Sequence, residues 1–321
     1  MSGQLGEIEA LTCPASGHGD QSALVTEMVT ALSEMPEIRS AGDESAGDIV
    51  NEAMRYSLRL RGKRARGLLV LLIANGWEKP WKSASDCAQA IEMVHTASLI
   101  IDDLPSMDNA NTRRGEPTNH AKYGEPTAVL AGIALLSEAL RILAASSQLS
   151  AQQRNQAVVC LASAIGPTGM SAGQMRDISP PEPSLANVEL THALKTGTLF
   201  AAAAELGCIA AGVDGPRKWM LSDFGMLLGK AFQEFDDLID VSTAAQDAGK
   251  DTQKDEGKPT VVGLLGRDAA MKRALRQIAM ALDCLEASRI QVDEIRRYTL
   301  DLTKAMRTVI GVDSAMAGKD T

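Results

Sequence analysis

The chain has 321 residues, of which 45% are hydrophobic and 23% charged, which is the composition of a globular protein and excludes a largely disordered one. Its net charge of −9 excludes an extensive nucleic-acid-binding surface, and taken alone it also argues against a strongly anionic small substrate. Five widely spaced cysteines without a CxxC pair argue against disulfides or a zinc site and predict a cytoplasmic location. No apolar stretch is expected to span a membrane.

The predicted elements are all helices. The apolar residues are mostly Ala, Leu, Met and Ile, and aromatic residues make up only 3%, which favours helix over sheet. Apolar residues recur at helical spacing, and alternation with a period of two is absent. In chain order the predicted helices are 22–35, 66–74, 86–104, 127–145, 151–164, 187–211, 217–240, 267–285 and 292–310.

Gly and Pro mark loops at 76–80, 105–126, 180–183 and 247–259, and no internal linker or repeat is visible. We therefore predict an all-α fold, a single-domain helical bundle that comprises residues 1–321. The ends of the chain, 1–20 and 313–321, are expected to be flexible.

The first notable motif is an apolar helix that runs into aspartates. Residues 91–108 read IEMVHTASLIIDDLPSMD, so His95, Ser98 and Asp102 lie on one face of the predicted helix. Asp108 would point away from Asp102 in a straight helix. Because Pro105 disfavours a continuous helix, we expect a bend there that returns Asp108 toward Asp102.

A second aspartate motif lies at 229–240, which reads GKAFQEFDDLID. Asp236 and Asp240 are four residues apart and share a helix face, with Gln233 one turn earlier. Carboxylates at a helix C-terminus repel one another and oppose the helix dipole, so a cation should compensate them. Hard oxygen ligands without clustered Cys or His favour Mg²⁺, which usually takes one or two carboxylates and phosphate oxygens. The two motifs are therefore interpreted as halves of a magnesium–phosphate site.

Basic residues accompany the aspartates. The run RLRGKRAR at 59–66 is mostly basic, Arg113 and Arg114 follow the first aspartate motif, and further lysines accompany the second. Each could be a solvated surface charge, but together they match what a diphosphate requires. The acidity of the chain thus does not exclude a diphosphate, because the aspartates can act on it through a metal.

A Thr-Gly-Thr sequence at 196–198 interrupts an alanine-rich helix next to Lys195. Gly weakens helices and Thr can bond to a carbonyl one turn back, so a local kink with unpaired carbonyls is one interpretation. Such carbonyls would suit a developing carbocation. A close helix crossing at small residues is the other interpretation.

Taken in order, these motifs resemble those of the trans-isoprenyl diphosphate synthases, most closely the bacterial short-chain geranylgeranyl or farnesyl diphosphate synthases. This chain departs from the family at Gly67, where Pro is frequent, and at Pro259, where a small polar residue is common. The matching segments are GKRAR (62–66), VHTASLIIDDLPSMDNANTRRGEPTNH (94–120), GQMRDIS (173–179), KTGTLF (195–200), FQEFDDLID (232–240) and GKDTQKDEGKPT (249–260).

The resemblance implies a homodimer of all-α bundles, each with a deep central cavity between the two aspartate motifs. It implies Mg²⁺, three ions with substrate bound, and the condensation of isopentenyl diphosphate with dimethylallyl, geranyl or farnesyl diphosphate. The implied metal ligands are Asp102, Asp103, Asp108, Asp236, Asp237 and Asp240. The implied substrate-binding residues are Lys63, Arg66, His95, Arg113, Arg114 and Lys258, and the implied catalytic residues are Lys195, Thr196, Gln233 and Lys250.

Product length should depend on the depth of the cavity below Asp102. Ala97, about 7.5 Å back along the helix, and Ser98 leave room where an aromatic residue would block a growing chain. The extra residues in the DDxxxxD motif are associated by the resemblance with bacterial short-chain enzymes. We therefore predict geranylgeranyl diphosphate as product, with farnesyl diphosphate as the alternative.

Other classes of protein share part of this pattern. A class I terpene cyclase uses an aspartate-rich motif and Mg²⁺, but it does not need the basic set of Lys63, Arg66 and Arg114. Head-to-head synthases of the phytoene type lack the GKRxR element. A non-catalytic synthase subunit would typically have lost one aspartate motif, and both are intact here.

Overall fold

The computed structural model describes residues 23–33, 46–60, 62–246 and 258–310. The termini predicted to be flexible and Lys250 lie outside these residues. Most of the described residues are helical. The helices are α2 (Ala23–Ser33), α3 (Ala46–Arg59), α4 (Ala65–Gly76), η1 (Trp81–Ala84), α5 (Ser85–Asp102), α6 (Asn119–Tyr123), α7 (Glu125–Ala145), α8 (Ala151–Ile165), α9 (Met170–Ile178), α10 (Leu185–His192), η2 (Ala193–Gly197), α11 (Thr198–Ala211), α12 (Pro216–Gln246), α13 (Val261–Leu265), α14 (Arg267–Ala287) and α15 (Asp293–Ile310).

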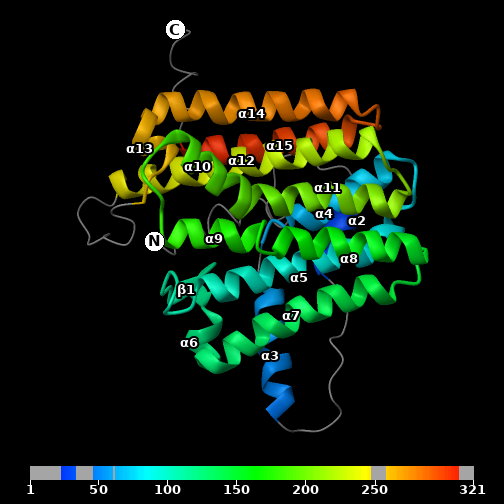
Figure 1. Ribbon diagram of the computed structural model, residues 1–321, viewed down its shortest axis with the longest axis horizontal. Helices are drawn as coiled ribbons and strands as arrows, with labels where there is room; N and C mark the ends of the chain where they lie inside the picture. The colour runs from blue at the N-terminus through cyan, green and yellow to red at the C-terminus, as the bar shows by residue number, and fades with distance from the viewer. Residues whose placement is uncertain (1–22, 34–45, 61, 247–257, 311–321) are drawn as a thin grey trace.

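The long helices form a bundle around α11 (Figure 1), which packs against α4, α8 and α12. The small residues of α11 permit this, and a Cβ built at Gly225 of α12 would lie 2.9 Å from the Ala201 Cα. The core between these helices includes the fully buried rings of Phe200, Phe224 and Phe235. The predicted all-α fold is confirmed, and α5 and α12 end on the same side of the bundle.

That side of the bundle also carries a two-stranded antiparallel hairpin, β1 (Thr112–Arg113) and β2 (Glu116–Pro117), in the segment predicted to be a loop. The hairpin lies next to the end of α5, and α13 lies near the end of α12 (Figure 1). Lys258, which precedes α13, lies 3.8 Å from Asp108 in the loop after α5, so two loops distant in sequence meet on this side of the bundle.

The predicted helices are present, but helices α3, α6, α9 and α13 were missed. Helix α3 was missed although Ala53, Met54 and Leu58 recur at helical spacing and are buried, whereas α6 and α13 have only five residues each and give no long apolar stripe. The helix predicted at 187–211 is divided into α10, the π-helical turn η2 and α11.

Two apolar helical segments correct the expectation about membrane spans. By length and composition alone, Glu125–Ala145 and Leu185–Ala211 could each cross a bilayer. The second segment runs through the core, and 61% of its most apolar window is buried. In α7 only 39% of that window is buried, which leaves an apolar face exposed.

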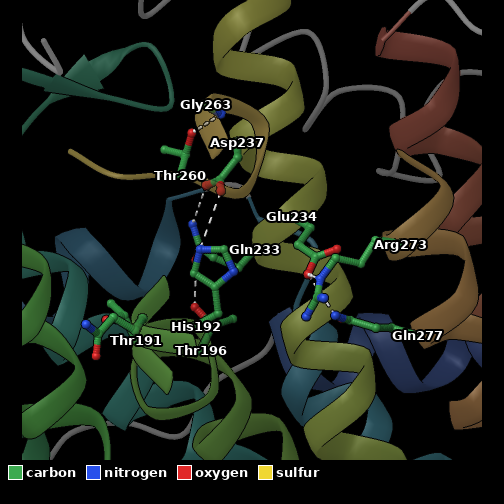
Figure 2. Close-up of polar contacts among 11 residues, drawn as sticks. Thr191, His192, Thr196, Gln233, Glu234, Asp237, Thr260, Gly263, Arg273 and Gln277 are labelled. Atoms are coloured by element: carbon green, nitrogen blue, oxygen red, sulfur yellow. Dashed lines mark hydrogen bonds and ion pairs between the residues drawn. The ribbon is translucent and has the colours of Figure 1, made fainter. Parts of the chain in front are cut away.

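A buried polar network holds α12 in place (Figure 2). Glu234 of α12 accepts hydrogen bonds from Arg273 and Gln277 of α14, each 2.7 Å long. Arg273 also pairs with Glu189 of α10. This network ties three helices together one residue away from Gln233, so it fixes the rotation of α12 about its axis.

Candidate active site

The first aspartate motif bends as predicted. The Asp108 N–H donates to the Asp102 carbonyl oxygen at 2.9 Å, so the chain doubles back after the end of α5. The Asn109 N–H donates to the Leu104 carbonyl, with a positive φ of 48° at Asn109. The bend places Asp108 beside Asp102, and both side chains are accessible to solvent.

Asp103 differs from its two neighbours. Its side chain is buried, and both carboxylate oxygens accept hydrogen bonds from the Arg113 Nε at 2.9 Å. The Arg113 Nη2 lies 2.8 Å from Asp103 Oδ1. Asp103 therefore anchors the hairpin to α5 and orients Arg113, and its carboxylate is occupied by the guanidinium.

The second aspartate motif shows the same division of roles. Asp236 and Asp240 are exposed, whereas Asp237 is buried. Figure 2 shows Asp237 pointing toward His192, whose Nε2 lies 3.4 Å from its Oδ2, while the Gln233 amide donates to its Oδ1 at 3.5 Å. His192 was not identified from the sequence. Asp237 thus joins α12 to the end of α10, and Asp236 and Asp240 face the solvent.

The Thr-Gly-Thr interruption is both a local distortion of the helix and a close helix crossing, and the unpaired carbonyls stay a prediction. Ala193–Gly197 forms a π-helical turn, a feature that often marks functional sites. It is also a close crossing, because a Cβ built at Gly229 of α12 would lie 2.8 Å from the Gly197 Cα. The Thr196 hydroxyl donates to Gln233 Oε1 at 2.7 Å across this crossing (Figure 2).

Asp177 holds two lysines beside the first aspartate motif. Its Oδ2 lies 2.8 Å from the Lys195 Nζ and 3.1 Å from the Lys258 Nζ. Lys258 also lies 3.8 Å from Asp108 of the first motif. Burial by itself raises the pKa of Asp177, but the two ammonium groups outweigh burial and hold the pKa below its usual value. Asp177 was assigned no role from the sequence, although GQMRDIS was recognised as a motif.

Replacing Asp177 with asparagine is expected to lower kcat by about 10²-fold, because both lysines lose the carboxylate that fixes their position. Steady-state turnover measures the effect. The matched control is Asp214→Asn, which breaks a lysine pair at an exposed carboxylate before α12 and should leave turnover unchanged. Equal turnover in the Asp177 variant and wild type would show that this carboxylate does not position the lysines.

The GKRAR segment divides its three cations between structure and site. Arg64 is buried, has a left-handed φ of 47°, and donates to the Leu58 and Leu60 carbonyls. The Arg66 guanidinium lies 4.5 Å from the centre of the Phe200 ring, and the Lys63 Nζ lies 5.9 Å from that of Phe232. Burial lowers the pKa of Arg66 to about 10.

Gly67 has a structural reason for its departure from the family pattern. Its N–H donates to the buried carboxylate of Glu92 at 2.8 Å, which a proline could not do. A Cβ there would also lie 2.8 Å from the Glu92 Cγ. Glu92 in turn lies 3.8 Å from Arg64, so this glutamate fixes the beginning of α4.

His95 lies among these cations. Burial lowers its pKa well below the usual value, and the charges of Arg66 and Arg114 lower it further. The imidazole is therefore neutral at physiological pH and can donate one hydrogen bond to a phosphate oxygen. Arg114 packs against Gly62, where a Cβ would lie 2.5 Å from its Nη1.

The exposed aspartates need a cation to balance their negative charges. Burial, together with Asp108, raises the pKa of Asp102 to about 6. Desolvation by the surrounding protein raises the pKa of Asp236 to about 7. Its side chain nevertheless remains accessible to solvent. Among the described residues no three His, Cys, Asp or Glu side chains can hold a metal by themselves. This donor set fits Mg²⁺ that completes its shell with phosphate oxygens and water.

The two chain-length residues differ in exposure. Ala97 is fully buried, and its carbonyl lies 3.9 Å from a Cβ built at Gly132 of α7. Ser98 is half-buried and donates to the His95 carbonyl at 2.8 Å. Ser98 is thus the more accessible position one turn before Asp102.

Solved structures show the fold to be that of the isoprenoid synthases. An FPP/GFPP synthase from Zymomonas mobilis matches with a TM-score of 0.73 at 30% identity, covering 93% of this chain and 98% of that chain. A geranyltransferase from Helicobacter pylori, complexed with magnesium and isoprenyl diphosphate, matches with a TM-score of 0.74 at 28% identity, covering 92% and 99%.

Sequence comparison identifies the family. A model described as polyprenyl synthetase matches residues 47–298. A geranylgeranyl diphosphate synthase of Pantoea ananas is 41% identical over 249 residues, which cover 76% of this chain and 82% of the relative. One from Pseudescherichia vulneris is 40% identical over 259 residues, which cover 78% and 82%. The chain belongs to the polyprenyl synthetase family, and its activity is that of a trans-prenyltransferase.

Proposed function

We propose that the protein condenses isopentenyl diphosphate with allylic diphosphates up to farnesyl and releases geranylgeranyl diphosphate. The observation that carries this proposal is that each accessible aspartate pair has cations beside it. Lys195 and Lys258, which Asp177 holds together, act on Asp102 and Asp108, and Lys63 and Arg66 act on Asp236. Similarity to geranylgeranyl diphosphate synthases supports the product assignment. Farnesyl diphosphate is the alternative product.

In this proposal the allylic diphosphate lies between the two aspartate motifs. Arg113, oriented by Asp103, and Lys195 and Lys258 bind its oxygens and stabilise the negative charge that grows as the C–O bond breaks. Lys250, outside the described residues, is proposed for the same task. The Thr196 and Gln233 oxygens face the allylic cation that remains.

The acceptor, isopentenyl diphosphate, is assigned to Lys63, Arg66, His95 and Arg114. These residues hold its diphosphate so that its double bond points toward the allylic cation. Attack forms the new C–C bond, and loss of a proton completes the elongation; the released diphosphate is proposed to accept that proton. This second basic group favours a chain-elongating synthase over a terpene cyclase.

Mg²⁺ is proposed as the resident metal, three ions with substrate bound. When bound, it neutralises charge on the departing diphosphate. Asp102 and Asp108 would hold it on one side and Asp236 and Asp240 on the other. The buried pairings of Asp103 with Arg113 and of Asp237 with His192 favour positioning roles for these two carboxylates, in place of the direct ligation first assigned to them.

The product assay tests the proposal directly. Purified protein, Mg²⁺ and isopentenyl diphosphate are combined with dimethylallyl, geranyl or farnesyl diphosphate, and the products are separated by chain length. We expect a twenty-carbon product from all three primers. A product that stops at fifteen carbons would make the farnesyl alternative correct.

The chain-length proposal predicts that an aromatic residue before Asp102 shortens the product. Ala97→Tyr is expected to shift the main product from twenty to fifteen carbons, and Ser98→Tyr to do so with less disturbance because Ser98 is half-buried. Gln89→Tyr, also half-buried on α5 but farther from Asp102, is the control and should keep the twenty-carbon product. Unchanged product length in both test variants would show that these two positions do not set the length of the product.

We also propose a homodimer, formed through the exposed apolar face of α7 and α8. Val129, Leu130 and Ile133 of α7 and Val159 of α8 are 40–57% exposed, an unusual amount of apolar surface for two adjacent helices. A single domain is supported by one core cluster that extends from Val25 to Ile310. A cytoplasmic location is supported by the four free cysteines among the described residues.

The dimer proposal predicts that Leu130→Glu/Ile133→Glu gives monomers, because two charges per chain would be desolvated in the interface. Light scattering after size exclusion measures the mass. Leu300→Glu on α15, where the leucine is 47% exposed, is the matched control and should keep the wild-type mass. If the double variant keeps it as well, this face is not the interface.

A further inference from the structure

A recess lies outside the two aspartate motifs, bounded by α3, the β1–β2 hairpin and α6. It has a cavity volume of about 580 Å³. Its charged lining residues are four cations and two carboxylates, an excess of two positive charges in a chain whose net charge is −9. They are Arg55, Arg59, Arg114, Lys122, Glu52 and Glu116.

Tyrosines fix the walls of the recess. The Tyr56 hydroxyl of α3 donates to the Pro117 carbonyl of the hairpin at 2.7 Å, and the Tyr123 hydroxyl of α6 donates to Glu52 at 3.1 Å. The two rings meet edge to face with their centres 5.6 Å apart. The Lys122 ammonium lies 3.8 Å from the centre of the Tyr56 ring, which holds it at the recess. The hairpin and α6, which are adjacent in the sequence, are thus joined to the distant α3 in one cationic site.

The two carboxylates of the recess do not cancel its positive charge. Glu52 is engaged by the Tyr123 hydroxyl, and burial together with this bond raises the pKa of Tyr123 to about 12, so the phenol remains a donor. Glu116 is exposed on the hairpin. Two guanidinium groups on successive turns of α3, with an ammonium opposite, suit a ligand with several negative oxygens.

Arg114 borders both the recess and the acceptor site. Its guanidinium packs against Gly62, which precedes Lys63, and its charge acts on His95. The same side chain lines the recess. A ligand in the recess would therefore lie next to the residues assigned to the acceptor diphosphate, with Arg114 between the two places.

We propose that this recess is a second binding site for a diphosphate group, independent of metal and adjacent to the acceptor site. This inference rests on the proposed function, because that function makes diphosphates the substrates and product of the protein. It adds a binding site for a diphosphate group that is separate from the sites of the two reacting substrates. The diphosphate group can come from two sources, incoming isopentenyl diphosphate or released inorganic diphosphate.

Equilibrium dialysis with the full-length protein in EDTA tests the proposal, because chelation removes binding that depends on a metal. The probes are isopentenyl diphosphate and inorganic diphosphate. Wild type is expected to bind a second equivalent of at least one probe. Arg59→Gln/Lys122→Gln should weaken that equivalent by about tenfold and leave kcat at saturating substrate unchanged. Lys79→Gln/Lys304→Gln removes the same charge from exposed positions elsewhere and is the control.

The outcomes separate the sources and the hypotheses. Sensitivity of inorganic diphosphate binding to the Arg59/Lys122 change identifies released diphosphate as the occupant, and sensitivity of isopentenyl diphosphate alone identifies the incoming substrate. Identical binding curves for the recess variant and its control overturn the proposal. Failure of the proposed function would instead appear as absent turnover in wild type, whatever the recess binds.

Discussion

Replacing Asp236 with asparagine is expected to lower kcat by about 10³-fold while the fold is retained. Asp236 is one of the exposed carboxylates at the end of α12, and desolvation together with Asp240 and Asp237 raises its pKa to about 7 against the opposing charges of Lys63 and Arg66. Asparagine keeps the shape but removes the charge that would bind Mg²⁺, so charge on the departing diphosphate is no longer neutralised. Turnover at saturating Mg²⁺ and substrates measures the loss.

Asp223→Asn is the matched control, because Asp223 is exposed on the same helix but lies more than three turns from Asp236. It should keep wild-type turnover, and both variants should keep the helical circular dichroism of the wild type. Asp102→Asn should reproduce the Asp236 result from the opposite side of the site. Wild-type turnover in both site variants would refute the metal model.

Replacing Gly173 with alanine is the second substitution with a large expected effect. A Cβ at Gly173 of α9 would lie 2.5 Å from the Lys195 Cα, and the contact is with backbone, which cannot rotate away. The π-helical turn must therefore move, and Lys195 moves with it. We expect about 2 kcal/mol less stability and about 10²-fold lower kcat.

A loss of stability would identify the backbone clash as its cause, because a glycine to alanine change inside a helix otherwise stabilises the protein by about 0.5–1 kcal/mol. Gly132→Ala on α7 is the control, since its Cβ would lie 3.2 Å from the Ile101 Cγ1 and 3.4 Å from the terminal Cδ1, atoms of a side chain that can rotate. Urea denaturation and turnover should be measured on both variants. A Gly173 variant at least as stable and active as wild type would show that this approach of α9 to η2 is not required.

The helical class of the protein could be predicted because it depends on local composition. Runs rich in Ala, Leu and Met predicted the long helices, whereas the short α6 and α13 carry too little apolar periodicity to detect. Helix α3 was overlooked although Ala53, Met54 and Leu58 form an apolar stripe on it. The bend at Pro105 was also predictable, since the ring restricts the backbone locally. The η2 turn was foreseen only as one of two interpretations, and the structure shows a distorted helix together with a close crossing.

The candidate site was only partly predictable. Asp102 and Asp103 are adjacent and chemically identical, yet one is accessible and the other is held by Arg113 from a hairpin that the sequence did not reveal. Asp236 and Asp237 differ in the same way because of His192. The sequence placed Asp177 within a recognised motif but gave it no role, which became clear only from its contacts with Lys195 and Lys258.

By itself, then, the sequence determined that this protein is an all-α member of a diphosphate-using class, and it located the residues that can bear charge. Helix propensity, proline geometry and residue spacing act within a few positions along the chain, so they can be predicted without knowledge of the tertiary structure. Only the tertiary structure decided which carboxylates face the site and which hold other side chains in place. That choice depends on burial and on partners tens of residues away, such as Lys195 and Lys258 for Asp177, and no local pattern encodes it.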